Sequence, residues 1–337
     1  MSVPTLVVPV GDPAGVGPEV AVRAAVDLRE SCSVALVGDA ARLGALAHAL
    51  GARTTPLAPD AIVALAPGVI GLVDAGAVAH EVVAARAPTR AGGAAQLTAL
   101  DLAVRAVRER RADAIVTGPT SKAAITLTGT PFIGQTEHLA RASGLGDDDV
   151  SMLFLGPHLR VALATTHLAI RDVAAAVTGA RVERAIAHLA SALHALGVET
   201  PRVVCASLNP HAGEGGLFGD EDERVVAVAV RAARARPPFS DGRASLVGPS
   251  PAEAAFRDAV AGRADGVVAM FHDQATIASK LLDWGEAVNV TWGLPFVRTS
   301  VDHGVAYDAA ARGEGSADGM RAALRMAVTL VRAGTVP

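Results

Sequence analysis

Short apolar runs alternate with helix-like segments along this chain, and three of those runs end at a histidine. The three runs are Val161–His167, Val203–His211 and Val267–His272. Strands that alternate with helices predict a largely parallel sheet with both faces covered. In such sheets ligands bind beyond the carboxyl ends of the strands, so three histidines delivered there can converge on one point. Three imidazoles with an open fourth position form a catalytic divalent-metal site, although each histidine could instead be only a polar residue at a strand end.

The composition excludes several classes of function. The 337 residues suffice for two domains, and the net charge of -4 gives no reason to expect nucleic-acid binding or attraction to an anionic membrane. No uncharged apolar run approaches the roughly eighteen residues that a membrane span needs. The start of the chain, Met1–Val10, lacks the basic region of a signal peptide and resembles a first strand. Cys32 and Cys205 each stand alone in apolar stretches, which is typical of a reducing compartment. We therefore expect a cytoplasmic enzyme that acts on neither nucleic acid nor membrane.

Two familiar nucleotide-binding motifs are absent from the sequence. Neither Gly-x-Gly-x-x-Gly nor Gly-x-x-x-x-Gly-Lys-Ser/Thr occurs, which argues against a classical dinucleotide fold and against an NTPase. A dehydrogenase with this sequence must bind its nucleotide in some other way.

Two tracts have the composition of ligand-binding loops. The glycines of Asn209–Gly219 allow the backbone to approach a ligand closely, and the acids of Asp220–Glu223 are expected to open a helix. Arg298–His303 combines an arginine, two hydroxyls, an aspartate and a histidine, a set suited to a phosphate or a carboxylate. The residues alone predict a three-histidine metal enzyme that acts on an anionic small molecule.

Helical spacing is clearest in two places. A helix is expected to open near Pro18, because proline suits the first turn. A second helix is expected over residues 182–196, where apolar residues recur with helical periodicity. His188 lies beside that apolar stripe, and we expect it to be a solvated helix residue rather than a ligand.

Five motifs occur together and in order along nearly the whole chain, from about residue 6 to residue 330. They resemble those of the 4-hydroxythreonine-4-phosphate dehydrogenase family of pyridoxal-phosphate biosynthesis. The motifs are Gly11–Glu19, Thr117–Lys122, Asn209–Gly216, His272–Gln274 and Gly293–Gly304.

This resemblance implies an α/β fold like that of isocitrate and isopropylmalate dehydrogenases, with two domains, a central cleft and a homodimer. The implied fold differs from the classical Rossmann fold. The first domain is expected over residues 1–125 and 285–337 and includes the cofactor segment. The second, over residues 126–284, is expected to supply the metal ligands and the dimer contacts.

The resemblance also assigns roles to individual residues. It implies that the metal ligands are His167, His211 and His272, with the active site shared across the dimer. The implied substrate-binding residues are Gln135, Thr136, Lys280, Asn289 and Arg298, and the implied NAD-binding residues are Asp302, His303, Gly304 and Ala306.

The reaction that the resemblance implies accounts for these residue types. NAD takes a hydride from the carbon that bears the C3 hydroxyl of a phosphorylated substrate. One divalent metal ion per site (Zn, Mg, Mn or Co) stabilises the alkoxide, and Lys280 acts as the proton shuttle. The β-keto acid then loses CO₂, because a metal can stabilise the developing enolate.

Other substrates and other reactions stay open. Relatives in the family oxidise D-threonate or D-erythronate 4-phosphate, and some act on a cyclic dihydrodiol. From another class, a phosphate acyltransferase on a related fold or a metal-dependent hydrolase would turn over no NAD.

One position departs from the family pattern. The usual Gly-His-Thr-Glu motif reads Gly134-Gln135-Thr136-Glu137 here, so a glutamine replaces a histidine that contacts substrate. Glutamine offers a donor and an acceptor but cannot become cationic near neutral pH. We expect the substitution to be tolerated, because Thr136, Lys280, Asn289 and Arg298 are all retained.

Overall fold

The computed structural model describes residues 3–62 and 65–334. The chain divides into two compact units, which we describe separately. Unit 1 lies within Met1–Asp147 and Leu294–Val336, and unit 2 lies within Asp148–Gly293. The sequence placed these boundaries near residues 125 and 284. Within the described ranges, no helix is both long enough and apolar enough to span a membrane.

Unit 1 contains a parallel sheet with the strand order β3-β4-β2-β1-β5-β12. Leu6, Val7 and Val8 of the central strand β1 are at most 1% exposed. Parallel strands that are covered on both faces read as continuous apolar runs, which is the pattern seen in the sequence. The strands are β1 (Thr5–Pro9), β2 (Ser33–Gly38), β3 (Arg53–Leu57), β4 (Val69–Asp74), β5 (Ala114–Thr117) and β12 (Val297–Ser300).

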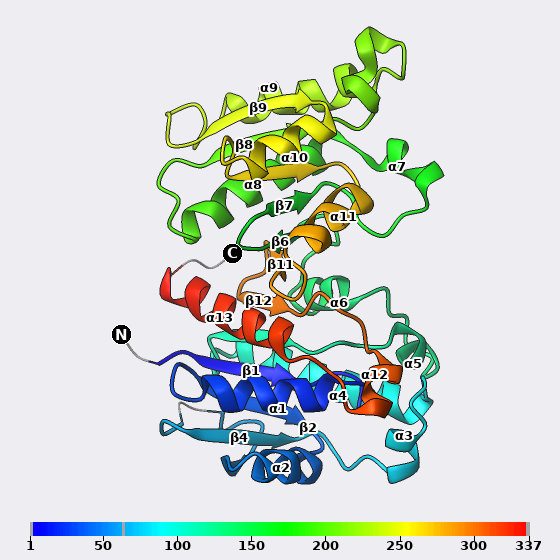
Figure 1. Cartoon of the computed structure of the whole chain (residues 1–337), viewed down its shortest axis with the longest axis vertical. Helices are drawn as coiled ribbons and strands as arrows, with labels where there is room; N and C mark the ends of the chain where they lie inside the picture. Colours follow the sequence, from blue (N-terminus) through cyan, green and yellow to red (C-terminus); the bar gives the residue numbers. More distant parts are fainter. Residues whose placement is uncertain (1–2, 63–64, 335–337) are drawn as a thin grey trace. The chain divides into compact units, whose positions relative to one another are not determined.

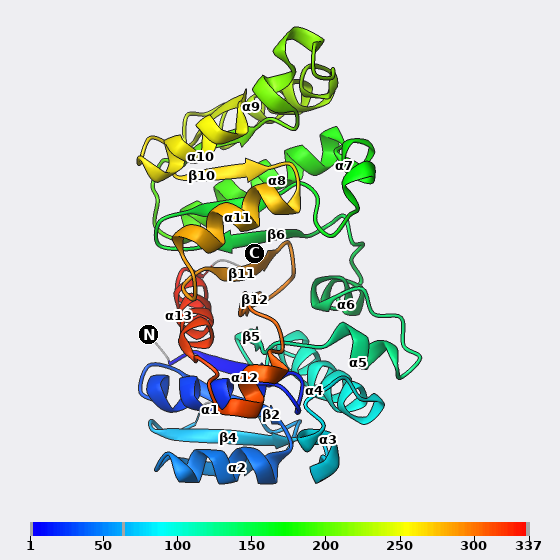
Figure 2. The same cartoon turned by 45° about the vertical axis from the view of Figure 1, so that its right-hand side comes forward.

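Helices cover the strands of unit 1 on both faces (Figures 1 and 2). Pro18 lies in the first turn of α1, as predicted, and the side chains of Asp39 and Thr89 cap α2 and α4. The helices are α1 (Gly17–Leu28), α2 (Ala40–Ala49), α3 (His80–Ala84), α4 (Arg90–Arg108), α5 (Lys122–Thr126), α6 (Gln135–Ala142), α12 (Tyr307–Arg312) and α13 (Asp318–Arg332).

Unit 2 contains a mixed sheet with the order β11-β6-β7-β10-β8-β9. The strands β7, β10, β8 and β9 are parallel, but β6 is antiparallel to both of its neighbours. Only residues 156–159 join β6 to β7, a connection too short for a parallel crossover. The strands are β6 (Ser151–Leu155), β7 (Arg160–Leu163), β8 (Arg202–Ala206), β9 (Ser245–Ser250), β10 (Gly266–Ala269) and β11 (Val288–Trp292).

The helices of unit 2 also lie on both faces of their sheet, with α8 and α10 on opposite sides (Figure 2). The predicted stripe on α8 is confirmed, since Val182, Ile186 and Leu189 are fully buried. The helical segments are α7 (Ile170–Ala176), α8 (Gly179–Ala195), η1 (Pro210–Gly216), η2 (Asp222–Val226), α9 (Ala227–Arg234), α10 (Ala252–Val260) and α11 (His272–Leu282).

His188 is less solvated than predicted, because its side chain is half-buried. His188 Nδ1 lies 3.0 Å from the Ser151 hydroxyl, and burial together with the nearby Arg184 charge lowers the pKa of His188 to about 4. Helical periodicity places this side chain beside the buried stripe, but only the packing of α8 against the sheet decides that it is covered.

The first strand in the order of unit 1, β3, and the last strand in the order of unit 2, β9, each contain a proline. Pro56 lies in β3, and Pro249 lies in β9. Proline has no backbone N–H to donate to a neighbouring strand, and it is tolerated at sheet edges for that reason.

Candidate functional site

Two of the histidines predicted to bind metal lie side by side in unit 2. His167 follows β7, and His272 is the first residue of α11, which begins three positions beyond the end of β10. The strands β7 and β10 are parallel neighbours, so their carboxyl ends meet at the same edge of the sheet. The two imidazole centroids are 5.3 Å apart, with the ring planes tilted by 42°.

A cavity of about 390 Å³ opens at this edge. Its size falls in the range of small-molecule sites. The residues that line it are Thr166, His167, Leu168, Ile170, Val173, Phe271, His272 and Asp273. The cavity therefore combines an apolar wall with two imidazoles and one carboxylate.

The geometry of this pair fits two ligands of one metal ion. Two imidazoles bound tetrahedrally through nitrogens at about 2.0–2.1 Å place their centroids about 5 Å apart. His272 Nδ1 lies 2.7 Å from Asp273 Oδ1, and histidines that bind metals commonly use their second nitrogen in such a contact. This contact leaves Nε2 of His272 as the nitrogen that a metal ion could use.

His211 does not line this cavity. It lies on the turn η1, and the ring nearest to it is that of Phe218, with the centroids 6.2 Å apart. In the part of the chain that the structure describes, no three His, Cys, Asp or Glu side chains are arranged to hold a metal ion. One chain thus brings together two of the three predicted ligands, and the role of all three as metal ligands stays a prediction.

The turn that carries His211 has an unusual backbone. His211, Ala212 and Glu214 all have positive φ, at 53°, 54° and 45°. A left-handed conformation costs a non-glycine residue roughly 1–2 kcal/mol, so the surrounding structure must hold this turn in place.

A buried aspartate secures that turn at its base. Asp222 is 1% exposed and accepts hydrogen bonds from the backbone N–H groups of Leu208 (2.7 Å) and Asn209 (2.8 Å). The Asn209 side chain in turn donates to Glu221 at 2.8 Å. The sequence indicated an acidic helix start here, but nothing in it showed that Asp222 would bind back to the preceding loop.

In unit 1 the structure brings Arg298 and Gln135 together. Arg298 on β12 is 3% exposed, and its Nη2 donates to Gln135 Oε1 (2.6 Å) and to the Thr117 hydroxyl (2.9 Å). Gln135 Nε2 donates to the carbonyl of Gly118 at 2.9 Å, which fixes the orientation of the amide. Burial lowers the pKa of Arg298 to about 10, and the nearby Glu137 opposes this shift.

The remaining predicted substrate contacts are distributed over both units. Thr136 follows Gln135 in the first turn of α6 in unit 1. Lys280 lies in the last turn of α11, the helix that His272 opens, and Asn289 lies on β11, both in unit 2.

The segment Asp302–Ala306 connects β12 to α12 in unit 1. Its Val305 carbonyl accepts a hydrogen bond of 3.0 Å from the Val16 N–H, and a Cβ on Gly15 would lie only 2.2 Å from the Val305 side chain. Gly304 is exposed, with open space where a Cβ would be. These contacts place the glycine motif of residues 11–19 directly against the predicted cofactor segment.

His303 provides a test of whether a cofactor fits this segment. Its Nδ1 lies 3.0 Å from the Gly304 carbonyl, whereas its Nε2 is buried with no hydrogen-bond partner among the described residues. Buried polar atoms in folded proteins are almost always paired. A polar group that still lacks a partner, beside an open glycine, fits a segment that receives a ligand.

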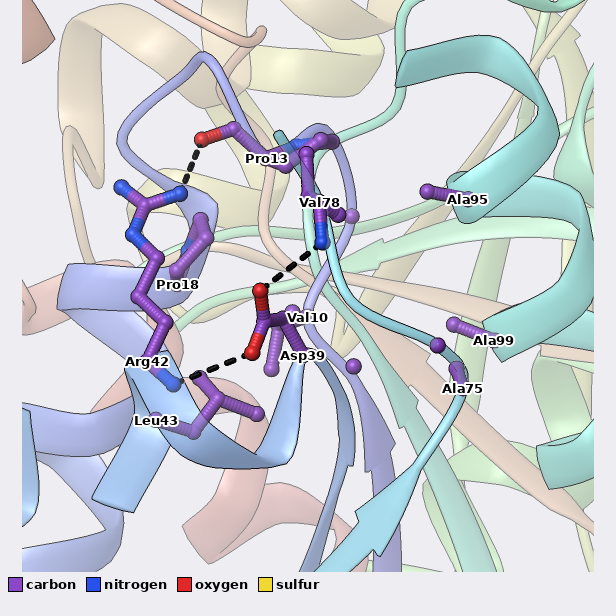
Figure 3. A pocket seen from close by; sticks show the side chains of 13 residues that line it. Val10, Pro13, Pro18, Asp39, Arg42, Leu43, Ala75, Val78, Ala95 and Ala99 are labelled. Carbon is purple, nitrogen blue, oxygen red and sulfur yellow. Dashed lines mark hydrogen bonds between the residues drawn. The ribbon is translucent and has the colours of Figure 1, made fainter. Parts of the chain in front are cut away.

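A second cavity in unit 1 lies behind the glycine motif (Figure 3). Arg42 donates to the Pro13 carbonyl at 2.5 Å, and Asp39 accepts from the N–H groups of Arg42 (3.1 Å) and Val78 (2.9 Å). The cavity volume is about 20 Å³, enough for one water molecule and far too small for a nucleotide. Its polar groups therefore support the loop rather than bind a cofactor.

Known proteins of one family match this chain over most of its length. A family model described as "Pyridoxal phosphate biosynthetic protein PdxA" matches residues 30–327. The chain belongs to the PdxA family.

Its relatives cover nearly the whole chain. A 4-hydroxythreonine-4-phosphate dehydrogenase from Geobacter metallireducens is 40% identical over 98% of this chain and 96% of its own length. A Cutibacterium acnes protein whose name assigns it, provisionally, as a D-threonate 4-phosphate dehydrogenase is 36% identical over 98% and 94%. The crystal structure of a 4-hydroxythreonine-4-phosphate dehydrogenase from Klebsiella pneumoniae is 33% identical, covers 98% of both chains and superposes with a TM-score of 0.82.

Membership in the PdxA family makes the chain an oxidoreductase and confirms the predicted α/β fold class. Within this PdxA chain, sequence reasoning missed two features that the structure shows. These are the base of the His211 turn at Asp222 and the direct contact of Gln135 with Arg298. Gln135 and Arg298 are 163 positions apart, and Asp222 and Leu208 are 14 positions apart, so local sequence patterns do not indicate either contact.

Proposed function

We propose that this chain oxidises 4-hydroxythreonine 4-phosphate (4-phosphonooxy-L-threonine) at its C3 hydroxyl, with NAD as hydride acceptor and a divalent metal ion. Decarboxylation of the product then gives 3-amino-2-oxopropyl phosphate. The observation that carries the proposal is the imidazole pair of His167 and His272, 5.3 Å apart in a cavity of about 390 Å³. Relatives named for this reaction, up to 40% identical, support it.

The histidines would hold the metal ion. When bound, a divalent ion lowers the pKa of a coordinated hydroxyl and stabilises negative charge on its oxygen. Neutral imidazoles favour zinc or cobalt over magnesium. Asp273 would keep the Nδ1 proton of His272 in place, so that Nε2 presents its lone pair to the cavity.

Lys280 would take the proton of the substrate hydroxyl. It lies two helical turns beyond His272 on α11, about 12 Å along the axis, and its side chain is half-buried. Its long side chain can reach back along the helix toward the cavity end. The neutral amine can accept a proton, and the ammonium group that results has three rotatable donors that can contact an anionic substrate.

Arg298 would bind one anionic end of the substrate. Its guanidinium is buried, and the contacts with Thr117 and Gln135 hold it in a fixed orientation. A fixed guanidinium can form two parallel hydrogen bonds with a phosphate or a carboxylate. Thr136 and Asn289 would add neutral hydrogen bonds that position the rest of the molecule.

The segment of Asp302, His303, Gly304 and Ala306 would bind NAD. The open face of Gly304 and the buried Nε2 of His303 support this assignment, together with the absence of the usual dinucleotide motif from the sequence. NAD supplies the hydride acceptor, and the protein supplies its placement.

The enzyme would work as a homodimer. Helix α11 and the residues after it expose large apolar side chains, with Ile277 60%, Leu281 80% and Trp284 76% exposed. A second copy would cover them, since exposed apolar patches of this kind mark interfaces. His211 of the partner subunit would then complete the set that His167 and His272 begin.

Mixing variants tests this sharing of ligands. A dimer of His272→Ala with His211→Ala keeps one intact site if these ligands come from different subunits. Random pairing should then restore about a quarter of wild-type turnover. The control is His272→Ala mixed with His167→Ala, which should stay inactive because both ligands come from the same subunit. No recovery in the first mixture, with heterodimers demonstrated by co-purification of differently tagged subunits, would place all three ligands on one subunit.

Two observations support a second candidate substrate, D-threonate 4-phosphate. Gln135 replaces the histidine of the family motif, and a relative of similar coverage is named for D-threonate 4-phosphate. The deciding experiment is a panel of phosphorylated four-carbon acids with NAD and metal, read by NADH absorbance. Turnover of 4-hydroxythreonine 4-phosphate supports the proposal, and turnover of an aldonate alone changes the substrate. No NADH with any acid would favour the hydrolase or acyltransferase alternative.

A further inference from the structure

A buried polar network joins the predicted cofactor segment to the body of unit 1. Asp12 is 1% exposed, and its Oδ2 accepts hydrogen bonds from the Tyr307 hydroxyl (2.7 Å) and from Gln96 Nε2 (2.9 Å). Its Oδ1 accepts from the Ala14 N–H at 2.9 Å, and Gln96 Oε1 accepts from the Ser121 N–H at 2.8 Å. The Asp12 carboxylate thus connects the glycine motif, α4 and the start of α12. Gln96 extends this network to Ser121, in the loop before α5.

Tyr307 directly follows the segment Asp302–Ala306. Ala306, the residue before it, has φ 49° and ψ 60°, a left-handed conformation that costs a non-glycine residue about 1–2 kcal/mol. Helix α12 extends only over Tyr307–Arg312, too short to be stable by itself. The strained backbone therefore depends on contacts at its ends.

Two contacts at the ends of the segment supply that support, and the Ser121 side chain bonds Tyr307 as well. The Val16 N–H donates to the Val305 carbonyl, and the Tyr307 hydroxyl donates to Asp12. A hydrogen bond to a charged partner contributes more than a neutral one, so the Tyr307 bond is the stronger of the two. Burial raises the pKa of the Asp12 carboxyl, while its bonds to Tyr307, Ala14 and Gln96 lower it, so losing the tyrosine bond makes the charge of Asp12 harder to keep.

We propose that the hydrogen bond between Tyr307 and Asp12 fixes the conformation of Asp302–Ala306, which makes Tyr307 a positioning residue for the nucleotide. This inference rests on the proposed NAD-binding role of the segment. Tyr307 acts through the backbone of its neighbours, and Asp12 acts through Tyr307.

The test is Tyr307→Phe, which removes one oxygen atom and keeps the ring. We expect the dissociation constant of NAD, measured by calorimetry without substrate, to rise about tenfold. The Michaelis constant for NAD should rise in parallel, with kcat and the Michaelis constant for substrate within twofold of wild type. Amide hydrogen exchange of the protein without ligands should accelerate over residues 302–312 and nowhere else.

Two further variants make the result interpretable. Thr98→Val removes an exposed hydroxyl from α4, where Thr98 bonds only its own helix, and should change none of these readouts. Asp12→Asn replaces one acceptor oxygen with an NH2 donor, which must face either the Ala14 N–H or the Tyr307 hydroxyl and Gln96 Nε2, so it should lose at least as much NAD affinity as Tyr307→Phe.

The outcomes separate this inference from the proposed function. If Tyr307→Phe binds NAD as tightly as wild type, the inference is wrong. It is also wrong if exchange accelerates throughout unit 1, because the role of Tyr307 is then generally structural. If wild type binds no NAD, the proposed cofactor role fails, and the nucleotide-positioning role of Tyr307 fails with it.

Discussion

The two units prepare their candidate site residues in different ways. In unit 1, Arg298 and Tyr307 are bonded to other side chains of the same unit, and the acceptors Gln135 and Asp12 are held in turn. In unit 2, the imidazoles of His167 and His272 line an open cavity, and His211 stands apart on a strained turn. The groups expected to bind anion and nucleotide are thus preorganised within one chain, whereas the expected metal centre is incomplete there. The predicted anion and nucleotide contacts thus lie within one chain, whereas the predicted set of three metal ligands is not brought together there.

The largest effect is expected from breaking the imidazole pair of unit 2. His272→Ala should lose bound divalent metal and reduce turnover by more than about a thousandfold, roughly 4 kcal/mol of barrier. The measurements are metal content by plasma emission and NADH formation. His48→Ala, at an exposed position on α2, is the control and should behave as wild type. Full metal occupancy in His272→Ala would remove this residue from the metal site.

The next effect is a dependence of the stability of unit 2 on pH, which His188 should cause. The pKa of His188 is about 4 in the folded chain, below the 6.5 of a free histidine. The unfolded chain therefore binds more protons between these values, and unit 2 should lose stability as pH falls from about 6.5 to about 4. The loss is at most about 3 kcal/mol.

Tryptophan fluorescence can follow this transition in unit 2 alone, since the two tryptophans, Trp284 and Trp292, both lie there. His188→Gln should flatten the dependence of the unfolding midpoint on pH. An equally steep dependence in that variant would show that other groups control the acid sensitivity of unit 2.

A smaller effect is expected from loosening the preorganised cluster of unit 1. Lysine cannot bond Thr117 and Gln135 while also presenting a fork to an anion, so Arg298→Lys should raise the Michaelis constant for substrate about a hundredfold, or about 2.7 kcal/mol. The steady-state rate against substrate concentration measures it. Arg325→Lys, on the exposed side of α13, is the matched control. A Michaelis constant within threefold of wild type would exclude Arg298 from substrate binding.

The smallest effect is expected at the position that departs from the family motif. A neutral imidazole also offers an acceptor to Arg298, so Gln135→His should change turnover of 4-hydroxythreonine 4-phosphate by less than about tenfold, or roughly 1.4 kcal/mol. Gln135→Leu, which removes the acceptor, should cost more than Gln135→His. The reverse ranking would mean that the contact with Arg298 does not orient the guanidinium.

Local pattern was sufficient to predict much of the fold. The apolar runs became strands, the periodic segment became α8, and His167 and His272 follow the carboxyl ends of neighbouring parallel strands. Periodicity and chain order determine these features, because they depend on residues close in sequence.

The features that sequence reasoning missed depend on contacts between distant segments. The burial of His188 and the return of Asp222 to the backbone of Leu208 are set by packing. The left-handed backbone at Ala212 contradicts its intrinsic preference, so no propensity could indicate it. The resemblance named Gln135 and Arg298 separately, and only the structure shows that they touch.

The prolines in the end strands have a consequence for colloidal behaviour. Open strand edges can recruit other chains into continuous sheets, which is a common route to aggregation. Pro56 in β3 and Pro249 in β9 interrupt the row of donors that such growth requires. The proposed dimer would form through side chains and not through strand edges. The chain can therefore associate in this way and still have a low tendency to form fibrils.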